Sequence, residues 1–203
     1  MSIETAPAVP VYCDFIKQSG SSAIIDTGVK IPSLGSIYVQ AYATANFSQR
    51  AIVGADDGNG GSTTIRIKTS GGTRTWYCNY DGGATANRNG GALNSRLYCG
   101  LTPYRFFGSM SATTLTKGST APDENVKIFS FGNYSGGATL YIGPVYIYGS
   151  DAKDETTIQA LATHTPVATF LPCTYRGAAG FWHVEEDRFI GNSGTGTLSA
   201  INI

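Results

Sequence analysis

Charged side chains are scarce in this chain. Lysine plus arginine and aspartate plus glutamate each total 14, so charged residues make up only 14% of the 203 residues, against about 25% in an average soluble domain. The formal net charge is zero. Proteins that bind nucleic acid or anionic lipid through charge carry a basic excess. We therefore expect neither nucleic acid nor a membrane surface among the partners.

Long apolar runs are also missing. No stretch approaches the roughly 18 apolar residues that mark a membrane-spanning helix, so we expect no membrane insertion. The first residues, MSIETAPAVP, have neither the basic start nor the apolar core of a secretory signal peptide. We expect synthesis in the cytoplasm without an export signal.

Residues typical of catalytic and metal sites are few. The two histidines, His164 and His183, stand far from any nucleophile motif, and GxSxG does not occur. The cysteines form no CxxC pair, which argues against a zinc ribbon or a redox motif. In a reducing compartment we expect them to be buried free thiols. They are Cys13, Cys78, Cys99 and Cys173.

The best carboxylate cluster is Glu185-Glu186-Asp187. A retaining glycosidase needs two carboxyl groups about 5 Å apart on one side of the sugar, whereas contiguous strand residues point to opposite faces. The apolar surroundings that would raise one pKa are absent from the sequence. We predict a solvated hairpin turn here, and no enzymatic activity.

Glycine, by contrast, is abundant, with 26 residues. It supplies the positive φ angles of tight hairpin turns. Apolar residues alternate with polar ones between these turns, at residues 37–43 and again around Ile65, Ile67, Val145 and Ile147, which is the pattern of half-buried strands. The glycine-rich turns are predicted at 56–61, 70–72, 81–83, 89–91 and 135–137. Many short strands separated by turns predict an all-β sandwich or barrel.

Two segments depart from this rhythm. Residues 154–163 are predicted as one short helix, with Asp154 as N-cap and Ile158 and Leu161 on one face. Residues 81–91 have almost no apolar side chain and predict a long exposed loop. With no shift in composition along the chain, we assign an N-terminal arm at residues 1–11 and one domain at residues 12–203.

A series of short motifs runs from residue 15 to residue 196. They are FIKQSG (15–20), IIDTGV (24–29), IFSF (128–131), YIY (146–148), FLPC (170–173), GFW (180–182) and GTG (194–196). In content and order they resemble the concanavalin A-like, laminin G-like domains of gut bacteria and their phages. The resemblance covers about residues 12–200 and implies a two-sheet antiparallel jelly-roll sandwich. Residues 151–166 replace a tight hairpin of that family, and His183 stands where it has an aspartate.

An aromatic and polar group precedes one of the glycine turns. Ring faces stack on the C–H surfaces of sugars while amide and carboxylate groups hold the hydroxyls, and large rings also favour protein interfaces. We predict ligand or partner contact at this group, with core packing open as the alternative for the tryptophan. Its members are Trp76, Tyr77, Asn79, Tyr80 and Asp81.

A possible cation site lies in the turn at residues 56–61. Asp56, Asp57 and Asn59 offer the carboxylate and amide oxygens that calcium prefers. The spacing lacks the EF-hand pattern, so a plain turn is the alternative. Calcium is the only cofactor that the sequence raises.

These observations favour a binding or structural protein. We hypothesise a non-enzymatic bacteriophage virion protein, located in the virion as a capsid decoration or tail fibre component. Its partners would be other virion proteins or copies of itself, as a homo-oligomer, and glycans of the host surface. The low charge and the many Gly, Ser, Thr and Tyr residues motivate this hypothesis, and the family resemblance adds the phage context. The alternative is a free carbohydrate-binding module of a gut bacterium.

Overall fold

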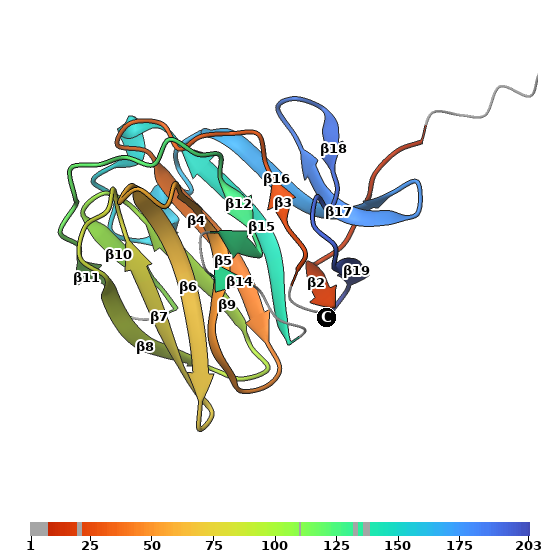
Figure 1. Cartoon of the computed structure of the whole chain (residues 1–203), viewed down its shortest axis with the longest axis horizontal. Coiled ribbons are helices and arrows are strands. Elements are labelled where there is room, and N and C mark those ends of the chain that lie inside the picture. Colours follow the sequence, from red (N-terminus) through yellow and green to blue (C-terminus); the bar gives the residue numbers. More distant parts are fainter. Residues whose placement is uncertain (1–7, 20–21, 110, 132–133, 136–138) are drawn as a thin grey trace, which may run out of the picture.

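Two antiparallel sheets form the body of the computed structural model (Figure 1), which describes residues 8–19, 22–109, 111–131, 134–135 and 139–203. The first sheet has the order β11-β10-β9-β4-β15-β16-β17-β18, with β1 beside β16, β2 beside β15 and β19 beside β2. Its strands are β1 (Val11–Tyr12), β2 (Phe15–Ser19), β4 (Ser36–Ala43), β9 (Arg96–Leu101), β10 (Arg105–Gly108), β11 (Thr113–Thr114), β15 (Leu140–Tyr148), β16 (Pro166–Tyr175), β17 (Ala178–His183), β18 (Arg188–Ile190) and β19 (Thr197–Ile201).

The second sheet has the order β3-β12-β5-β6-β7-β8. Its strands are β3 (Ile25–Asp26), β5 (Phe47–Asp56), β6 (Ser62–Ser70), β7 (Thr73–Asn79), β8 (Ala86–Ala92) and β12 (Lys127–Ile128), and a separate short pair joins β13 (Ser130–Phe131) to β14 (Tyr134–Ser135). The predicted turns at 56–61 and 70–72 link β5 to β6 and β6 to β7. Gly136 and Gly137 of the predicted turn at 135–137 lie outside the described residues.

The alternating residues of facing strands build the core. On β4, Ile37, Val39 and Ala41 are fully buried, and on β6 so are Ile65 and Ile67. Successive side chains of a strand point to opposite faces, so each sheet turns one apolar face toward the other. The predicted all-β, two-sheet antiparallel sandwich is confirmed.

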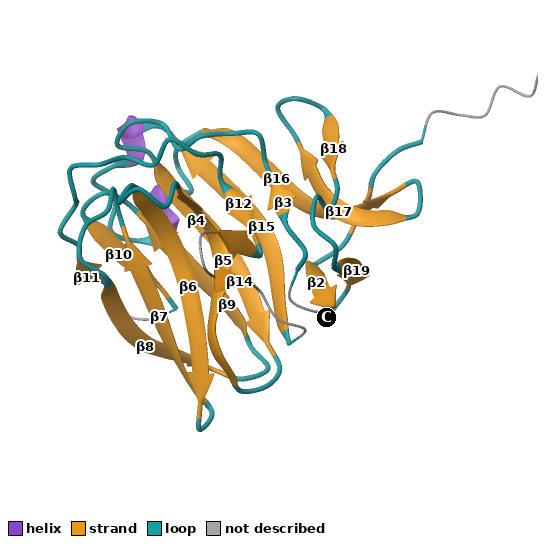
Figure 2. Ribbon diagram, viewed as in Figure 1, coloured by secondary structure: helices purple, strands orange, loops and turns teal. Residues whose placement is uncertain are grey.

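Among the described residues, helix occurs only in the connection between β15 and β16 (Figure 2). It holds a 3-10 turn, Ser150–Ala152, and the helix α1, Ile158–Leu161. The predicted short helix is thus present, but it begins later than expected, because Thr157 rather than Asp154 is the N-cap. The Thr157 side chain accepts a hydrogen bond from the backbone N–H of Ala160, at 3.1 Å.

The predicted exposed loop at residues 81–91 is wrong in its second half. Residues 86–92 form β8, which pairs with β7 from Ala86 opposite Cys78 to Ala92 opposite Thr73. Backbone hydrogen bonds need no apolar side chain, and β8 is an edge strand of its sheet. Its exposed polar residues, such as Asn87 and Asn89, are typical of a protected edge.

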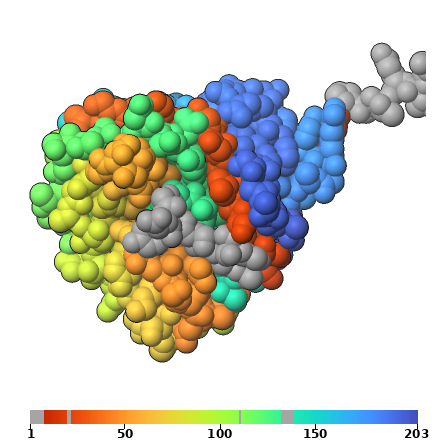
Figure 3. Space-filling view, in the orientation of Figure 1, coloured from red at the N-terminus to blue at the C-terminus, as the bar shows by residue number. Residues whose placement is uncertain are grey.

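The two ends of the described chain lie together. Strand β2 pairs with β19, from Phe15 opposite Ile201 to Ser19 opposite Thr197, and Figure 3 shows N-terminal residues (red) beside C-terminal ones (blue). Within the predicted arm, Val11 already belongs to β1, while residues 1–7 lie outside the described residues. Within the described part of the chain, no helix is long and apolar enough to cross a membrane.

All four cysteines are free thiols, as predicted. Cys78, Cys99 and Cys173 are buried and Cys13 is half-buried. Burial raises the pKa of Cys173 to about 11, so this thiol is protonated and unreactive at neutral pH.

Candidate ligand-binding groove

Tyrosines gather on the outer face of the first sheet. The residues that alternate with the buried positions of β4 are Tyr38, Gln40 and Tyr42, and they point away from the core. Register brings matching positions of the neighbouring strands alongside, with Tyr146 of β15 opposite Tyr38 and Tyr98 of β9 opposite Gln40. Three strands thus contribute to one aromatic surface.

The rings of this surface contact one another. Tyr38 is stacked with Tyr98, with ring centroids 6.4 Å apart, and tilted against Tyr146 at 5.4 Å. Tyr146 is stacked with Tyr148 at 6.5 Å. Contacts between rings fix their orientations, so the surface has a set shape before any ligand arrives.

The connection between β15 and β16 covers one side of this surface. We call residues 149–165 the cover segment. Its Ala152 and Leu161 are fully buried and pack with Tyr38, Phe107 and Tyr148. The Ser36 hydroxyl on β4 donates a hydrogen bond to the carbonyl oxygen of Ala152, at 3.2 Å, which anchors the segment to the sheet.

Two adjoining hollows lie where the cover segment meets the sheet, and we call them together the tyrosine groove. The larger, of about 480 Å³, is lined by Tyr98, Ser109, Thr156 and Gln159 among others. The smaller, of about 310 Å³, is lined by Gln40, Tyr146, Tyr148, Ala162, His164 and Pro166 among others. Tyr38 and Ile158 line both. The volumes are in the range of small-ligand sites.

The groove is almost free of charge. Burial raises the pKa of Tyr148 to about 12 and that of Tyr38 well above its usual value, so both phenols keep their protons at neutral pH. Gln40 donates a hydrogen bond to the Tyr38 hydroxyl at 3.1 Å. Of the residues that line the two hollows, His164 alone can carry charge near neutral pH. The groove therefore offers ring faces, hydroxyls and an amide.

The aromatic group predicted before the glycine turn at 81–83 lies elsewhere and is largely buried. Trp76 is fully buried and packs against Phe106, and Tyr80 is 1% exposed, with its hydroxyl donating to the Gly35 carbonyl oxygen at 2.6 Å. Trp76 thus follows the alternative of core packing, and for Tyr80 the prediction of ligand contact is corrected to core packing. The cause is the inner face of β7, which packs on the first sheet.

The polar members of that group serve the second sheet itself. Asn79 is hydrogen-bonded to Thr64 and Ser62, and Asp81 pairs with Lys117 at 2.8 Å. Both are 7% exposed. Tyr77 is half-buried and is the one member on the outer face with a substantial exposed surface. The structure thus does not bring these five residues together at an open site.

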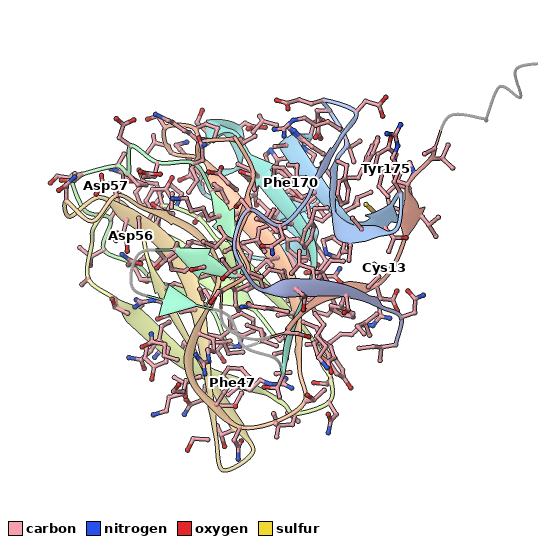
Figure 4. The ribbon with its side chains drawn as sticks, turned by 45° about the vertical axis from the view of Figure 1, so that its right-hand side comes forward. Cys13, Phe47, Asp56, Asp57, Phe170 and Tyr175 are labelled. Atoms are coloured by element: carbon pink, nitrogen blue, oxygen red, sulfur yellow. The ribbon has the colours of Figure 1, made fainter. Side chains whose placement is uncertain are left out.

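The predicted cation loop bonds to its own backbone. Asp56 Oδ1 accepts from the N–H of Gly58 at 3.1 Å, and Asp57 Oδ1 accepts from the N–H groups of Asn59 at 2.7 Å and Gly61 at 3.1 Å. The bond from Asn59 is the main reason that the pKa of Asp57 is lowered. In Figure 4 Asp56 and Asp57 lie at one end of the sandwich, away from Cys13 and Tyr175.

This donor set does not fit calcium as it stands, because the carboxylate oxygens already bind the amides that shape the turn. Among the described residues, no group of three or more His, Cys, Asp and Glu side chains is arranged to hold a metal ion. We therefore propose that this turn is stable without calcium, in place of the cation site that the sequence suggested.

The carboxylates near the C-terminus form the predicted turn between β17 and β18. Glu185 accepts a hydrogen bond from the backbone N–H of Thr169 at 2.7 Å, and Glu186 contacts Arg188 and His183. Asp187 has a positive φ of 49°. These side chains hold the hairpin and do not line either hollow.

Sequence reasoning missed the tyrosine groove. The signal was present as Tyr38-Val39-Gln40 and Tyr146-Ile147-Tyr148, in which polar rings alternate with core residues. This signal could predict a site only once the order of the strands β9, β4 and β15 in the sheet was known, because these strands are distant in the sequence.

No protein-family model matches the chain, and no curated protein matches it. Solved structures do. The native heptameric SAP-like pentraxin of Limulus polyphemus has a TM-score of 0.58 and 8% identity, over 95% of this chain and 97% of that one. A proposed carbohydrate-binding protein from Bacteroides ovatus has a TM-score of 0.50 and 9% identity, over 95% of this chain and 61% of that longer one. With the sheet order above, these likenesses show that the chain has the fold of a two-sheet jelly-roll sandwich.

Proposed function

We propose that this chain is a non-enzymatic carbohydrate-binding module that holds a neutral glycan in the tyrosine groove. The observation that carries the proposal is the set of three ring faces, Tyr38, Tyr98 and Tyr146, beside the Gln40 amide in two adjoining hollows. Tyr98 is 36% exposed, so part of its ring is open to a ligand.

The chemistry of the groove matches an uncharged sugar. Protonated phenols and an amide both donate and accept hydrogen bonds, as sugar hydroxyls do, while rings pack against the apolar C–H face of a pyranose. The charged groups beside the smaller hollow are His164, Asp151 and Glu155. Two carboxylates and one imidazolium sum to a negative charge, which disfavours acidic sugars.

The comparisons support this proposal at the level of the fold. The protein from Bacteroides ovatus, which shares the sandwich, is itself a proposed carbohydrate-binding protein. The identity of 9% does not extend a ligand to this chain. The residues of the groove therefore carry the argument.

A glycan array followed by calorimetry tests the proposal. We expect selective binding of neutral oligosaccharides, weakened roughly fivefold in Tyr98→Ala or Tyr146→Ala, since an aromatic contact contributes about 1 kcal/mol. Tyr12→Ala is the matched control, because Tyr12 is 52% exposed on β1 and lines neither hollow. Silence across the neutral glycans, or equal losses in all three variants, would refute a site in the groove.

We further propose that the module acts within a bacteriophage virion, as a capsid decoration or tail fibre component that adheres to host-surface glycans. Support comes from the composition, since a chain with only 14% charged residues suits close packing against other virion proteins or copies of itself. Capsid or tail genes beside its gene, and a homo-oligomer in light scattering, are the expected results. Neighbouring genes for polysaccharide breakdown and a monomer would favour a free module of a gut bacterium.

A further inference from the structure

One histidine ties together the two ends of the cover segment. The His164 ring lies between two carboxylates, with Nδ1 2.9 Å from Asp151 Oδ2 and Nε2 2.8 Å from Glu155 Oε1. Asp151 belongs to the 3-10 turn at the start of the segment, and His164 follows α1 near its end. We call these three residues the His164 clasp.

Only the doubly protonated ring satisfies this arrangement. A carboxylate accepts hydrogen bonds and does not donate them, and a neutral imidazole has one N–H and one lone pair. With both ring nitrogens facing carboxylates, a neutral His164 would set a lone pair against a carboxylate oxygen. The clasp is therefore complete with the imidazolium and loses one arm with the neutral ring.

The charged groups around His164 also favour its protonated form. Hydrogen bonds to Glu155 and then to Asp151 raise the pKa of His164, and the same bond lowers the pKa of Asp151. On the sheet side, the titratable groups that line the smaller hollow with His164 are Tyr38, Tyr146 and Tyr148, and all three are neutral near neutral pH because burial raises their pKa. Within the segment, Lys153 pairs with Asp154 at 2.7 Å.

The clasp has direct access to the groove. His164 itself lines the smaller hollow, and Thr156, Thr157 and Gln159, which lie between Glu155 and His164, line the larger one. The helix between Glu155 and His164, α1, is only four residues long. Short helices are marginal without tertiary support, so the clasp is placed to decide how firmly the segment sits on the tyrosines.

We propose that the His164 clasp holds the cover segment on the tyrosine groove at mildly acidic pH and releases it as the pH rises, so that glycan binding weakens on the alkaline side. The regulation of binding rests on the proposed function, whereas the release of the segment does not. Its sign follows from linkage. A histidine whose pKa is raised on folding stabilises the closed form fully below its unfolded pKa of about 6.5, and this contribution disappears as the pH rises through the raised value.

Hydrogen exchange tests the release without any ligand. Mass spectrometry of the full chain would follow the amides of Leu161, Ala162 and His164, which donate to Thr157, Ile158 and Leu161. After correction for intrinsic rates, we expect protection to fall several-fold between about pH 6 and about pH 8.5. Equal protection at the two pH values would overturn the clasp.

Three variants sharpen this test. His164→Gln should show low protection at both pH values, and Glu155→Gln should move the loss of protection to lower pH by removing one carboxylate. Asp154→Asn is the matched control, because it removes a neighbouring acid that bonds to Lys153. It should leave the transition in place; a shift as large as that of Glu155→Gln would contradict the specific role of the clasp.

Calorimetry with cellohexaose, maltohexaose and mannohexaose, at the same two pH values, tests the regulation. Binding that weakens several-fold at the higher pH in the parent chain, but not in His164→Gln, supports it. Equal affinity at both pH values despite a loss of protection overturns it. If none of the three sugars binds, the proposed function fails for these neutral chains, and the exchange data alone decide on the clasp.

Discussion

At the scale of single residues, the face of a strand decides what an aromatic side chain does. Trp76 and Tyr77 are neighbours on β7, yet Trp76 is fully buried against Phe106 and Tyr77 is half-buried on the outer face. The sequence shows both as rings beside a glycine turn. It could indicate that they face opposite ways, but not which face is covered by the other sheet.

This difference gives the first prediction. Trp76→Ala should lower the free energy of unfolding by about 3–5 kcal/mol, because a large buried ring leaves a cavity. Urea unfolding followed by circular dichroism measures it. Tyr77→Ala is the control and should cost less than about 1 kcal/mol, as a surface change does. Comparable losses in the two variants would mean that Trp76 is not a core residue.

At the scale of elements, alternation in the sequence predicted the strands that contribute to the core, and it failed where backbone pairing alone makes the strand. The alternating apolar residues of β4 and β6, such as Val39 and Ile67, are fully buried. Strand β8 has none fully buried, so its sequence gave no such signal. The tyrosine groove was out of reach for a further reason, since it depends on which strands become neighbours.

The loop between β5 and β6 carries the second prediction. Because the Asp57 carboxylate accepts the N–H groups of Asn59 and Gly61, it stabilises the turn without a cation. Adding calcium or a chelator should therefore leave the melting temperature unchanged in calorimetry, whereas Asp57→Ala should lower it. A melting temperature that rises with calcium concentration, as mass action requires for a bound ion, would show that the loop rearranges into a site.

The same carboxylate sets a pH dependence. The pKa of Asp57 is lowered in the folded chain, mainly by the amide of Asn59. A group of this kind stabilises the fold above its unfolded pKa and loses that contribution as the pH falls through the folded value. The difference in stability between the parent chain and Asp57→Ala should accordingly shrink in acid, below about pH 4.

At the scale of the whole molecule, the two faces of the first sheet differ: one builds the core and the other carries the tyrosine groove. Its inner face packs on the second sheet with residues such as Val39 and Ile147, and its outer face carries the tyrosines and the cover segment. The core therefore fixes the backbone positions from which the groove residues project. Substitution of Tyr98, which is 36% exposed on the outer face, can test binding with little effect on the fold.

The balance of charge over the molecule leads to the last prediction. Positive and negative residues are equal at 14 each, and the groove that we assign to glycan has ring faces, hydroxyls and an amide along most of its length. Contacts of this kind are not screened by salt, whereas binding of a charged ligand weakens steeply as ions are added.

Affinity for a neutral hexasaccharide, measured by calorimetry at about pH 6 so that the clasp is closed, should change less than about twofold between low and high salt. A sulfated or uronate oligosaccharide provides the control, and it should bind weakly at either ionic strength. Tight, salt-sensitive binding of such an acidic sugar would place the binding site on the Lys and Arg residues outside the groove and contradict a glycan site in the groove.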